Sequence, residues 1–343
     1  MNHMYKSFLV TCFLASVLLA SCSKSYNRGY VTQQTADLTK LNLFFDSLRP
    51  APQNFVVTAG FLQTVYGANG TKLTFYPNSF KDANGNTIKG DTIHIQLTEV
   101  YTPGAMIANR ATTVSNGQLL TSGGQVLITA TTNGQQVFAN RYGIGFKQAA
   151  PSQQPMLLFY GNTNTPDSVV AWMNPGSPQT GAYVTGTTAS SDTSIVYIIT
   201  PTGTDTITTH SAVMQYYQFD SCSSFNWINC DYFYSSAAQL TDVTVFVPDT
   251  SFNQSNTEVF VVFPTINAAA HMSQYNAAAH SFDLPKGYFI PVGLPIDIVV
   301  ATNKNGAYYY FQQTGITTVT GLFIFANMSQ SSLAYITAQL QGL

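Results

Sequence analysis

One segment of the chain, Asp220 to Asp231, brings two thiols and two carboxylates close together in sequence. Its cysteines, Cys222 and Cys230, lie eight positions apart on either side of Trp227. This spacing predicts a local disulfide, which would stabilise the fold by roughly 2–3 kcal/mol through loop closure. Zinc binding is the weaker interpretation, because two cysteines alone cannot complete a tetrahedral site. The spacing excludes a Cys-x-x-Cys redox motif.

The two aspartates of this segment are the best candidates for acid–base chemistry. A glycoside hydrolase needs two carboxyl groups about 5–10 Å apart, and Asp220 and Asp231 are the pair that could supply them. Aspartates also accept hydrogen bonds from the backbone of turns, and we favour this structural interpretation. The chain has no Gly-x-Ser-x-Gly, no His-Glu-x-x-His and no phosphate-binding glycine loop. We therefore expect no enzymatic activity, with a glycan hydrolase as the alternative.

Two further motifs contain residue types that bind metal ions. The run from Asp82 to Asn86 offers the alternating oxygen ligands that calcium prefers, but no glutamate closes the site, so we expect a hairpin turn at Asn84-Gly85. The sequence Asn-Ala-Ala-Ala-His occurs twice and ends at His271 and at His280. On one straight helix these histidines would lie on opposite faces. We expect helical turns or a loop there, and no metal or cofactor site.

The first residues of the chain predict an exported protein. Lys6 precedes an apolar run from Phe8 to Ala20, which is too short to cross a bilayer as a helix. The run ends in Leu19-Ala20-Ser21-Cys22, the pattern of a bacterial lipobox. In proteins that resemble this pattern, residues 1–21 are cleaved as a signal peptide and Cys22 is acylated on its thiol and its new amino group. Several acyl chains, at about 0.8 kcal/mol per buried CH2, hold a protein stably on a membrane.

Charge and composition exclude some functions and favour one fold class. Charged residues make up 8% of the chain, with a net charge of −2, and no basic block indicates a nucleic-acid partner. Ordinary soluble domains have about 25% charged residues, so this surface must consist mainly of Thr, Ser, Asn, Gln and Tyr. The acidic residues are almost all aspartates, with Glu99 and Glu258 as the exceptions. Because glutamate and lysine suit helical surfaces, their scarcity favours strands and turns.

Turn spacing and residue alternation predict an all-β fold of antiparallel β-sandwich domains in tandem. Residues 92–98 alternate, with Ile93, Ile95 and Leu97 on one face of a half-buried strand. Asn-Gly and Gly-Gly pairs recur about every 8–10 residues, as in a sandwich. The expected organisation is a tether at 22–50 with a short helix at 36–45, a β-sandwich region at 51–235 with a joint near 174–187, and a C-terminal β domain at 236–343.

Aromatic side chains are abundant, with 20 Tyr and 23 Phe. Exposed aromatic residues stack on sugar rings or anchor protein partners. Trp172, Trp227 and Tyr309 are therefore our candidates for a ligand-binding face. In the run Tyr308-Tyr309-Tyr310, side chains alternate if the run forms a strand, so at least one tyrosine must lie on the opposite face from its neighbours.

Several phrases of the chain resemble a class of Bacteroidota cell-envelope lipoproteins with β-sandwich domains. They are residues 70–80 (GTKLTFYPNSF), 122–126 (SGGQV), 158–161 (LFYG) and 226–231 (NWINCD). The first is also remotely similar to the sandwich domain shared by ankyrins and netrin receptors. The resemblance implies an outer-membrane lipoprotein held by the lipid on Cys22 and facing the periplasm or the cell surface, and it brings no catalytic residues. We expect a binding or structural role, with an envelope protein or a glycan as partner.

Overall fold

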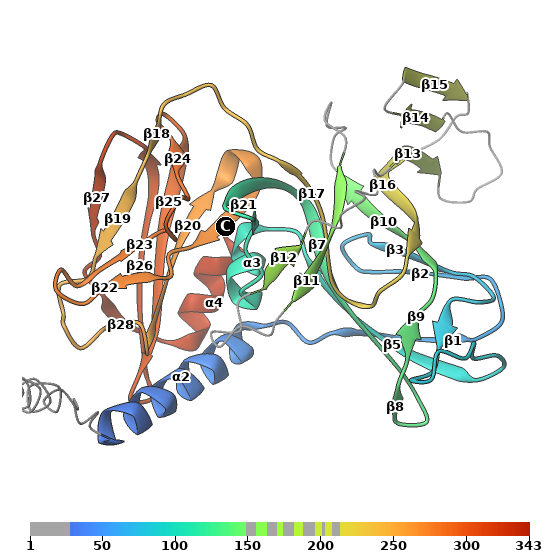
Figure 1. Ribbon diagram of the computed structural model, residues 1–343, viewed down its shortest axis with the longest axis horizontal. Coiled ribbons are helices and arrows are strands. Elements are labelled where there is room, and N and C mark those ends of the chain that lie inside the picture. Colours follow the sequence, from blue (N-terminus) through green and yellow to red (C-terminus); the bar gives the residue numbers. More distant parts are fainter. Residues whose placement is uncertain are drawn as a thin grey trace, which may run out of the picture.

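The computed structural model describes residues 28–148, 156–162, 170–173, 182–187, 196–200, 203–207 and 213–343. Two β-sandwiches lie side by side, and three helices lie at their junction (Figure 1). Strands predominate, and nearly all of the described strand pairs are antiparallel. The predicted all-β, sandwich-like fold is confirmed.

The first sandwich contains the strands from β1 to β17. One sheet runs in the order β1 (Gln53–Thr58), β5 (Thr92–Val100), β7 (Gln118–Thr132), β17 (Asn226–Phe233), β11 (Leu157–Asn162), β12 (Ala171–Met173), with β6 (Val114–Ser115) and β8 (Gln135–Gln136) paired to β7. The facing sheet runs β15 (Gly203–Ile207), β14 (Val196–Thr200), β13 (Ala182–Thr187), β16 (Val213–Cys222), β10 (Tyr142–Gln148), β3 (Lys72–Phe75), β2 (Gln63–Tyr66). A short ladder joins β4 (Phe80–Lys81) to β9 (Phe138–Ala139). In β5, Ile93, Ile95 and Leu97 are fully buried and alternate with the exposed Thr92, His94 and Gln96, which confirms the predicted half-buried strand over this part of β5.

The second sandwich contains the strands from β18 onward. Its five-stranded sheet runs β21 (Ala268–His271), β20 (Thr257–Phe263), β25 (Pro295–Lys304), β26 (Ala307–Thr317), β28 (Ser329–Ser331). The facing sheet runs β22 (Gln274–Asn276), β23 (Ser281–Asp283), β19 (Val243–Phe246), β27 (Leu322–Phe325), and a small ladder pairs β18 (Leu240–Thr241) with β24 (Ile290–Pro291). Every residue of β20 is buried, because this strand is covered on both faces.

The chain passes between the two sandwiches after Phe233, where β17 ends, and before Leu240, where β18 begins. This connection spans residue 235, the expected boundary. No such connection was found at the expected joint near 174–187, within the described residues of that range. Its residues 182–187 form β13, which pairs with β16 inside the first sandwich, and residues 174–181 lie outside the described part of the chain.

The junction is filled by an apolar cluster that we call the middle core. Helices α2 (Arg28–Leu48), α3 (Pro103–Asn109) and α4 (Leu333–Gln341) contribute to it, together with the outer face of one sheet from each sandwich. In α2 the buried residues Leu41, Phe44, Phe45 and Leu48 follow the spacing of one helical face. The helix extends well before the predicted 36–45, so residues 28–34, expected as tether, are helical. Among the described helices, none is both long and apolar enough to span a membrane.

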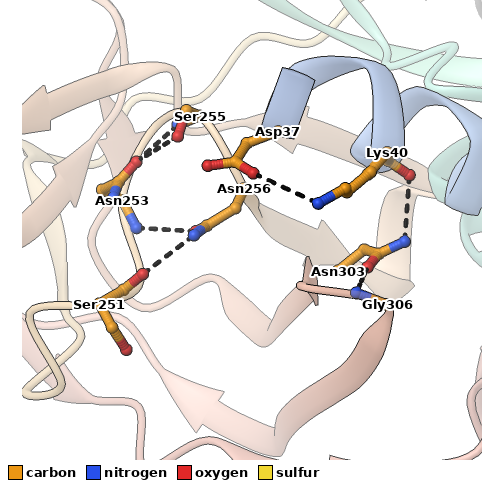
Figure 2. Close-up of polar contacts among 8 residues, drawn as sticks. All are labelled: Asp37, Lys40, Ser251, Asn253, Ser255, Asn256, Asn303 and Gly306. Carbon is orange, nitrogen blue, oxygen red and sulfur yellow. Dashed lines mark hydrogen bonds and ion pairs between the residues drawn. The ribbon is translucent and has the colours of Figure 1, made fainter. Parts of the chain in front are cut away.

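Polar contacts also fix α2 to the second sandwich (Figure 2). The Asn303 side chain donates from Nδ2 to the Lys40 carbonyl at 3.2 Å and accepts from the Gly306 amide at 3.0 Å. Asn303 thereby connects the tight β25–β26 turn to the helix backbone. On the helix itself, Lys40 lies 3.9 Å from the Asp37 carboxylate. The N-terminal helix is therefore part of the second sandwich's structure despite its distance along the chain.

A buried charged group lies in the middle core. Arg110, at the C-terminal end of α3, donates from Nη1 to Asn42 Oδ1 at 2.7 Å and lies 3.8 Å from Glu258 Oε1. The guanidinium also lies 5.0 Å from the ring of Phe45. The other carboxylate oxygen of Glu258 contacts His271 Nε2. These residues come from α2, the end of α3, β20 and β21, so the contacts join the second sandwich to two of the helices.

Candidate functional site

The aspartates considered for hydrolysis do not form an accessible pair. Asp231 lies in β17 with no exposed surface, and its Oδ2 accepts from Asn229 Nδ2 at 2.5 Å. Burial raises the pKa of Asp231 to about 8. Asp220 lies on β16, in the opposite sheet, and is exposed. A substrate at Asp220 therefore does not reach Asp231.

The predicted disulfide is absent from the structure, which holds Cys222 and Cys230 as free thiols. The prediction was wrong about local structure: only residues 223–225 form a loop, while Cys222 ends β16 and Cys230 lies within β17. Both side chains are buried in the core of the first sandwich. Burial raises the pKa of the Cys222 thiol to about 12 and that of Cys230 well above its ordinary value.

The aromatic residues predicted to bind a ligand do not form an exposed face of the protein. Trp172 and Trp227 are buried in the middle core, with ring centroids 6.3 Å apart in an edge-to-face arrangement. Trp172 Nε1 donates to the Thr112 carbonyl. Tyr309 is half-buried against Phe252, at 5.1 Å between ring centroids. The tryptophans were mispredicted because the second sandwich and the helices cover the outer face of their sheet.

The two motifs considered for metal binding form ordinary backbone structure. Asp82 Oδ1 accepts from the amides of Asn84 at 2.9 Å and Asn86 at 2.8 Å, and Gly85 takes the positive φ of the turn. Hydrogen bonds, chiefly from the Asn86 side chain, lower the pKa of Asp82. His271 ends strand β21, where helical turns or a loop were expected. Within the described residues, no group of three His, Cys, Asp or Glu side chains could hold a metal ion, and Cys22 lies outside those residues.

A candidate ligand site is a groove of about 720 Å³ on the second sandwich, which we call the neutral groove. It is lined by β26, β28, one side of α4 and the segment before β28. The lining residues are all uncharged: Tyr310, Phe311, Gln312, Thr314, Asn327, Ser329, Gln330, Ser331, Ser332, Tyr335 and Gln339. Such a set offers hydrogen-bond donors, acceptors and aromatic rings without a net charge.

Strand alternation builds the floor of the neutral groove. Tyr310, Gln312 and Thr314 occupy every second position of β26 and so project from one face of the sheet. The Tyr310 hydroxyl donates to Gln312 Oε1 at 2.8 Å, so this bond does not use the donors of the Gln312 amide nitrogen. Burial raises the pKa of Tyr310, so this hydroxyl stays protonated. As predicted, neighbouring tyrosines take opposite faces, since Tyr309 packs with the core of the second sandwich and Tyr310 with the middle core.

Helix α4 forms one wall of the neutral groove. Ser332 caps the helix by accepting from the Tyr335 amide at 3.1 Å. Ile336 and Leu340 hold an adjacent side of the helix in the middle core. Tyr335 and Gln339, one turn apart, both line the groove. The Tyr335 ring is 52% exposed and lies edge-to-face on Tyr310, with 6.2 Å between centroids.

No protein-family model matches the chain, and a search of curated proteins found no match to its sequence. The case for ligand binding in the neutral groove therefore depends on the chemistry of its lining residues alone. Sequence reasoning missed Tyr335, Gln339 and Gln330. Two signals in the sequence could have found the helix wall: a serine N-cap at Ser332, and the four-residue spacing of Ile336 and Leu340.

Proposed function

We propose that this protein is a lipid-anchored protein of the bacterial outer membrane that binds an uncharged glycan in the neutral groove. The observation that carries the binding proposal is a lining composed only of hydroxyl, amide and aromatic side chains. The lipobox at Leu19–Cys22 supports the anchor, and the resemblance to Bacteroidota envelope lipoproteins supports the location.

The chemistry of a neutral sugar matches these side chains. A sugar ring has an apolar face that packs on an exposed aromatic ring, and Tyr335 presents such a ring. The hydroxyl groups of the sugar need hydrogen-bond donors and acceptors, which the side chains of Gln312, Gln330 and Gln339 supply. The groove volume of about 720 Å³ also lies within the usual range for small-ligand sites. An acidic ligand would find no positive charge in this lining.

Glycan binding can be measured by calorimetry on the protein without its signal peptide, with a panel of neutral and acidic oligosaccharides. We expect a neutral oligosaccharide to bind, and Tyr335→Ala to weaken binding by about tenfold, or about 1.4 kcal/mol. Tyr66→Ala is the matched control, since Tyr66 is 57% exposed but lies on the first sandwich. Equal losses in both variants, or binding of acidic glycans alone, would contradict the proposal.

A further inference from the structure

We propose that the first sandwich has a second binding site, for a small ring-bearing carboxylate such as a sugar acid or an aryl acid. The site is a pocket of about 630 Å³, separate from the neutral groove. Its lining comes from residues 81–83 and Gly85, residues 128–130, residues 136–139 and residues 223–226. In Figure 1 the hairpin of β7 and β8 that contributes to it extends away from the second sandwich.

An aromatic ring and an ammonium group lie next to each other on this pocket. Phe138 on β9 is directly opposite Lys81 on β4 in an antiparallel pair. Side chains at such positions project to the same side, with Cβ atoms about 4.5–5.5 Å apart. Phe138 is 42% exposed, so part of its ring is open to a ligand. A ligand with a ring and a carboxylate can contact both side chains together.

The lining has two charged side chains, Lys81 and Asp82, and their hydrogen bonds determine which of them can bind a ligand. Lys81 is the only positively charged residue among those that line the pocket. Asp82, the one acidic residue of the lining, is engaged by its own turn, because its carboxylate accepts from two backbone amides and from Asn86 Nδ2 at 3.1 Å. In the described part of the chain, no carboxylate lies within ion-pair distance of Lys81. The pocket therefore presents one ammonium group for an anion.

The base of the pocket is rigid. The Phe225 ring packs against Tyr142 at 5.1 Å, Phe80 at 6.1 Å and Phe75 at 6.4 Å between centroids. The Tyr142 hydroxyl donates to the carbonyl of Ser224 at 2.9 Å, and this hydrogen bond holds the loop of residues 223–225 against the core of the first sandwich. A preformed pocket loses little entropy when a small ligand binds.

Asn226 adds an observation of strain at the same place. It lines the pocket with an exposed side chain and has a φ of 100°, a backbone conformation that residues other than glycine rarely adopt. Such strain costs of order 1–3 kcal/mol and concentrates at ligand sites. The Asn226 side-chain amide offers a hydrogen bond to the hydroxyl or carboxylate oxygens of a ligand, and the Thr129 hydroxyl, which donates to Gln96 Oε1, can accept one from a ligand hydroxyl.

Ligand-observed NMR on the mature chain tests this site with three probes: methyl glucuronide, phenylacetate and methyl glucoside as the uncharged match. We expect at least one carboxylate to bind with a millimolar Kd. We expect Lys81→Gln to weaken that binding about tenfold, and Phe138→Ala to weaken it as well. Lys89→Gln is the control, because Lys89 is exposed on the next loop and does not line the pocket. Circular dichroism and melting curves verify that each variant is folded.

The outcomes separate the sources and the two sites. Stronger binding of the glucuronide assigns a sugar acid, and stronger binding of phenylacetate assigns an aryl acid. Retention of carboxylate binding in Tyr335→Ala shows that the pocket acts independently of the neutral groove. The proposal is overturned if neither carboxylate binds, if methyl glucoside binds equally well, or if the two lysine variants lose the same affinity.

Discussion

At the scale of single residues, the most consequential side chain is Asp231. Burial raises its pKa to about 8, so the folded protein holds a proton there that the unfolded chain releases near pH 4. Between these values the folded state binds one more proton than the unfolded state. The stability that this proton provides is complete below about pH 4 and is lost as the pH rises to about 8.

We therefore expect the free energy of unfolding to contain a term that falls by about 1.4 kcal/mol per pH unit between about pH 4 and 8. Asp231→Asn should remove this term and raise stability at about pH 8, because the amide is neutral throughout. Urea unfolding at several pH values measures the difference. Asp220→Asn, at an exposed site, should leave the pH dependence unchanged. The interpretation fails if Asp231→Asn and the wild-type protein show the same slope.

The two core cysteines give a second prediction at this scale. Because both thiols are buried and their pKa values are raised, neither should react with a thiol reagent in the folded protein at about pH 8. After denaturation without reductant, both should react. Counting thiols with Ellman's reagent in protein from the native envelope provides the measurement. No reactive thiol after denaturation would instead show that Cys222 and Cys230 form a bridge.

Sequence reasoning at this scale succeeded where burial depends on a strand's own pattern and failed where it depends on a distant element. The alternation of Ile93, Ile95 and Leu97 is local, and β5 follows it. Trp172 and Trp227 were predicted to be exposed, but both are buried in the middle core, which elements distant in the sequence help to form. Tyr309 was one position away from the groove residue Tyr310, because sequence alone does not say which face of β26 meets α4.

At the scale of elements, α2 is the clearest departure from expectation. Its sequence was interpreted as a tether with a short helix, yet its apolar face fills the middle core and Asn303 holds its backbone. The spacing of Leu41, Phe44, Phe45 and Leu48 predicts a helical face. It does not identify the surface that this face meets, which comes from α3 and from strands more than two hundred residues later.

Substitutions on α2 should separate its two faces. Phe45 is fully buried, with its ring 6.1 Å from that of Phe260, so Phe45→Ala should lower the free energy of unfolding by about 3–5 kcal/mol. Leu43 is 62% exposed, so Leu43→Ala should change it by about 0.5 kcal/mol or less. Urea unfolding of both variants measures the contrast. Similar small effects in the two would mean that α2 is not an integral part of the fold.

At the scale of the whole molecule, tandem sandwiches were predictable because short strands and frequent turns recur along the chain. Their junction was not, because α2, α3, α4 and both sheets must come together to form it. The neutral groove follows the same logic. Its lining combines β26, β28 and α4, and α4 keeps its position only because Ile336 and Leu340 reach the middle core.

The proposed membrane attachment also belongs to the scale of the whole molecule. We expect Cys22→Ala to abolish acylation and to move the protein from the membrane to the soluble fraction, since acyl chains supply the apolar contact with the bilayer. Fractionation with a high-salt wash, and mass spectrometry of the N-terminal peptide, measure the two effects. If the variant stays in the washed membrane fraction, the lipid on Cys22 is not what holds the protein there.

The central claim is that the neutral groove binds an uncharged glycan. Hydrogen–deuterium exchange, with and without neutral oligosaccharides from the cell envelope, tests it most directly, because the method locates the protected residues and a mixture of sugars can serve as the ligand. Binding in the neutral groove predicts slower exchange in β28 and the first turns of α4, residues 329–339, and little change in the first sandwich. The same protection should be lost in Tyr335→Ala. Unchanged exchange at residues 329–339, or protection confined to the first sandwich, would contradict glycan binding in this groove.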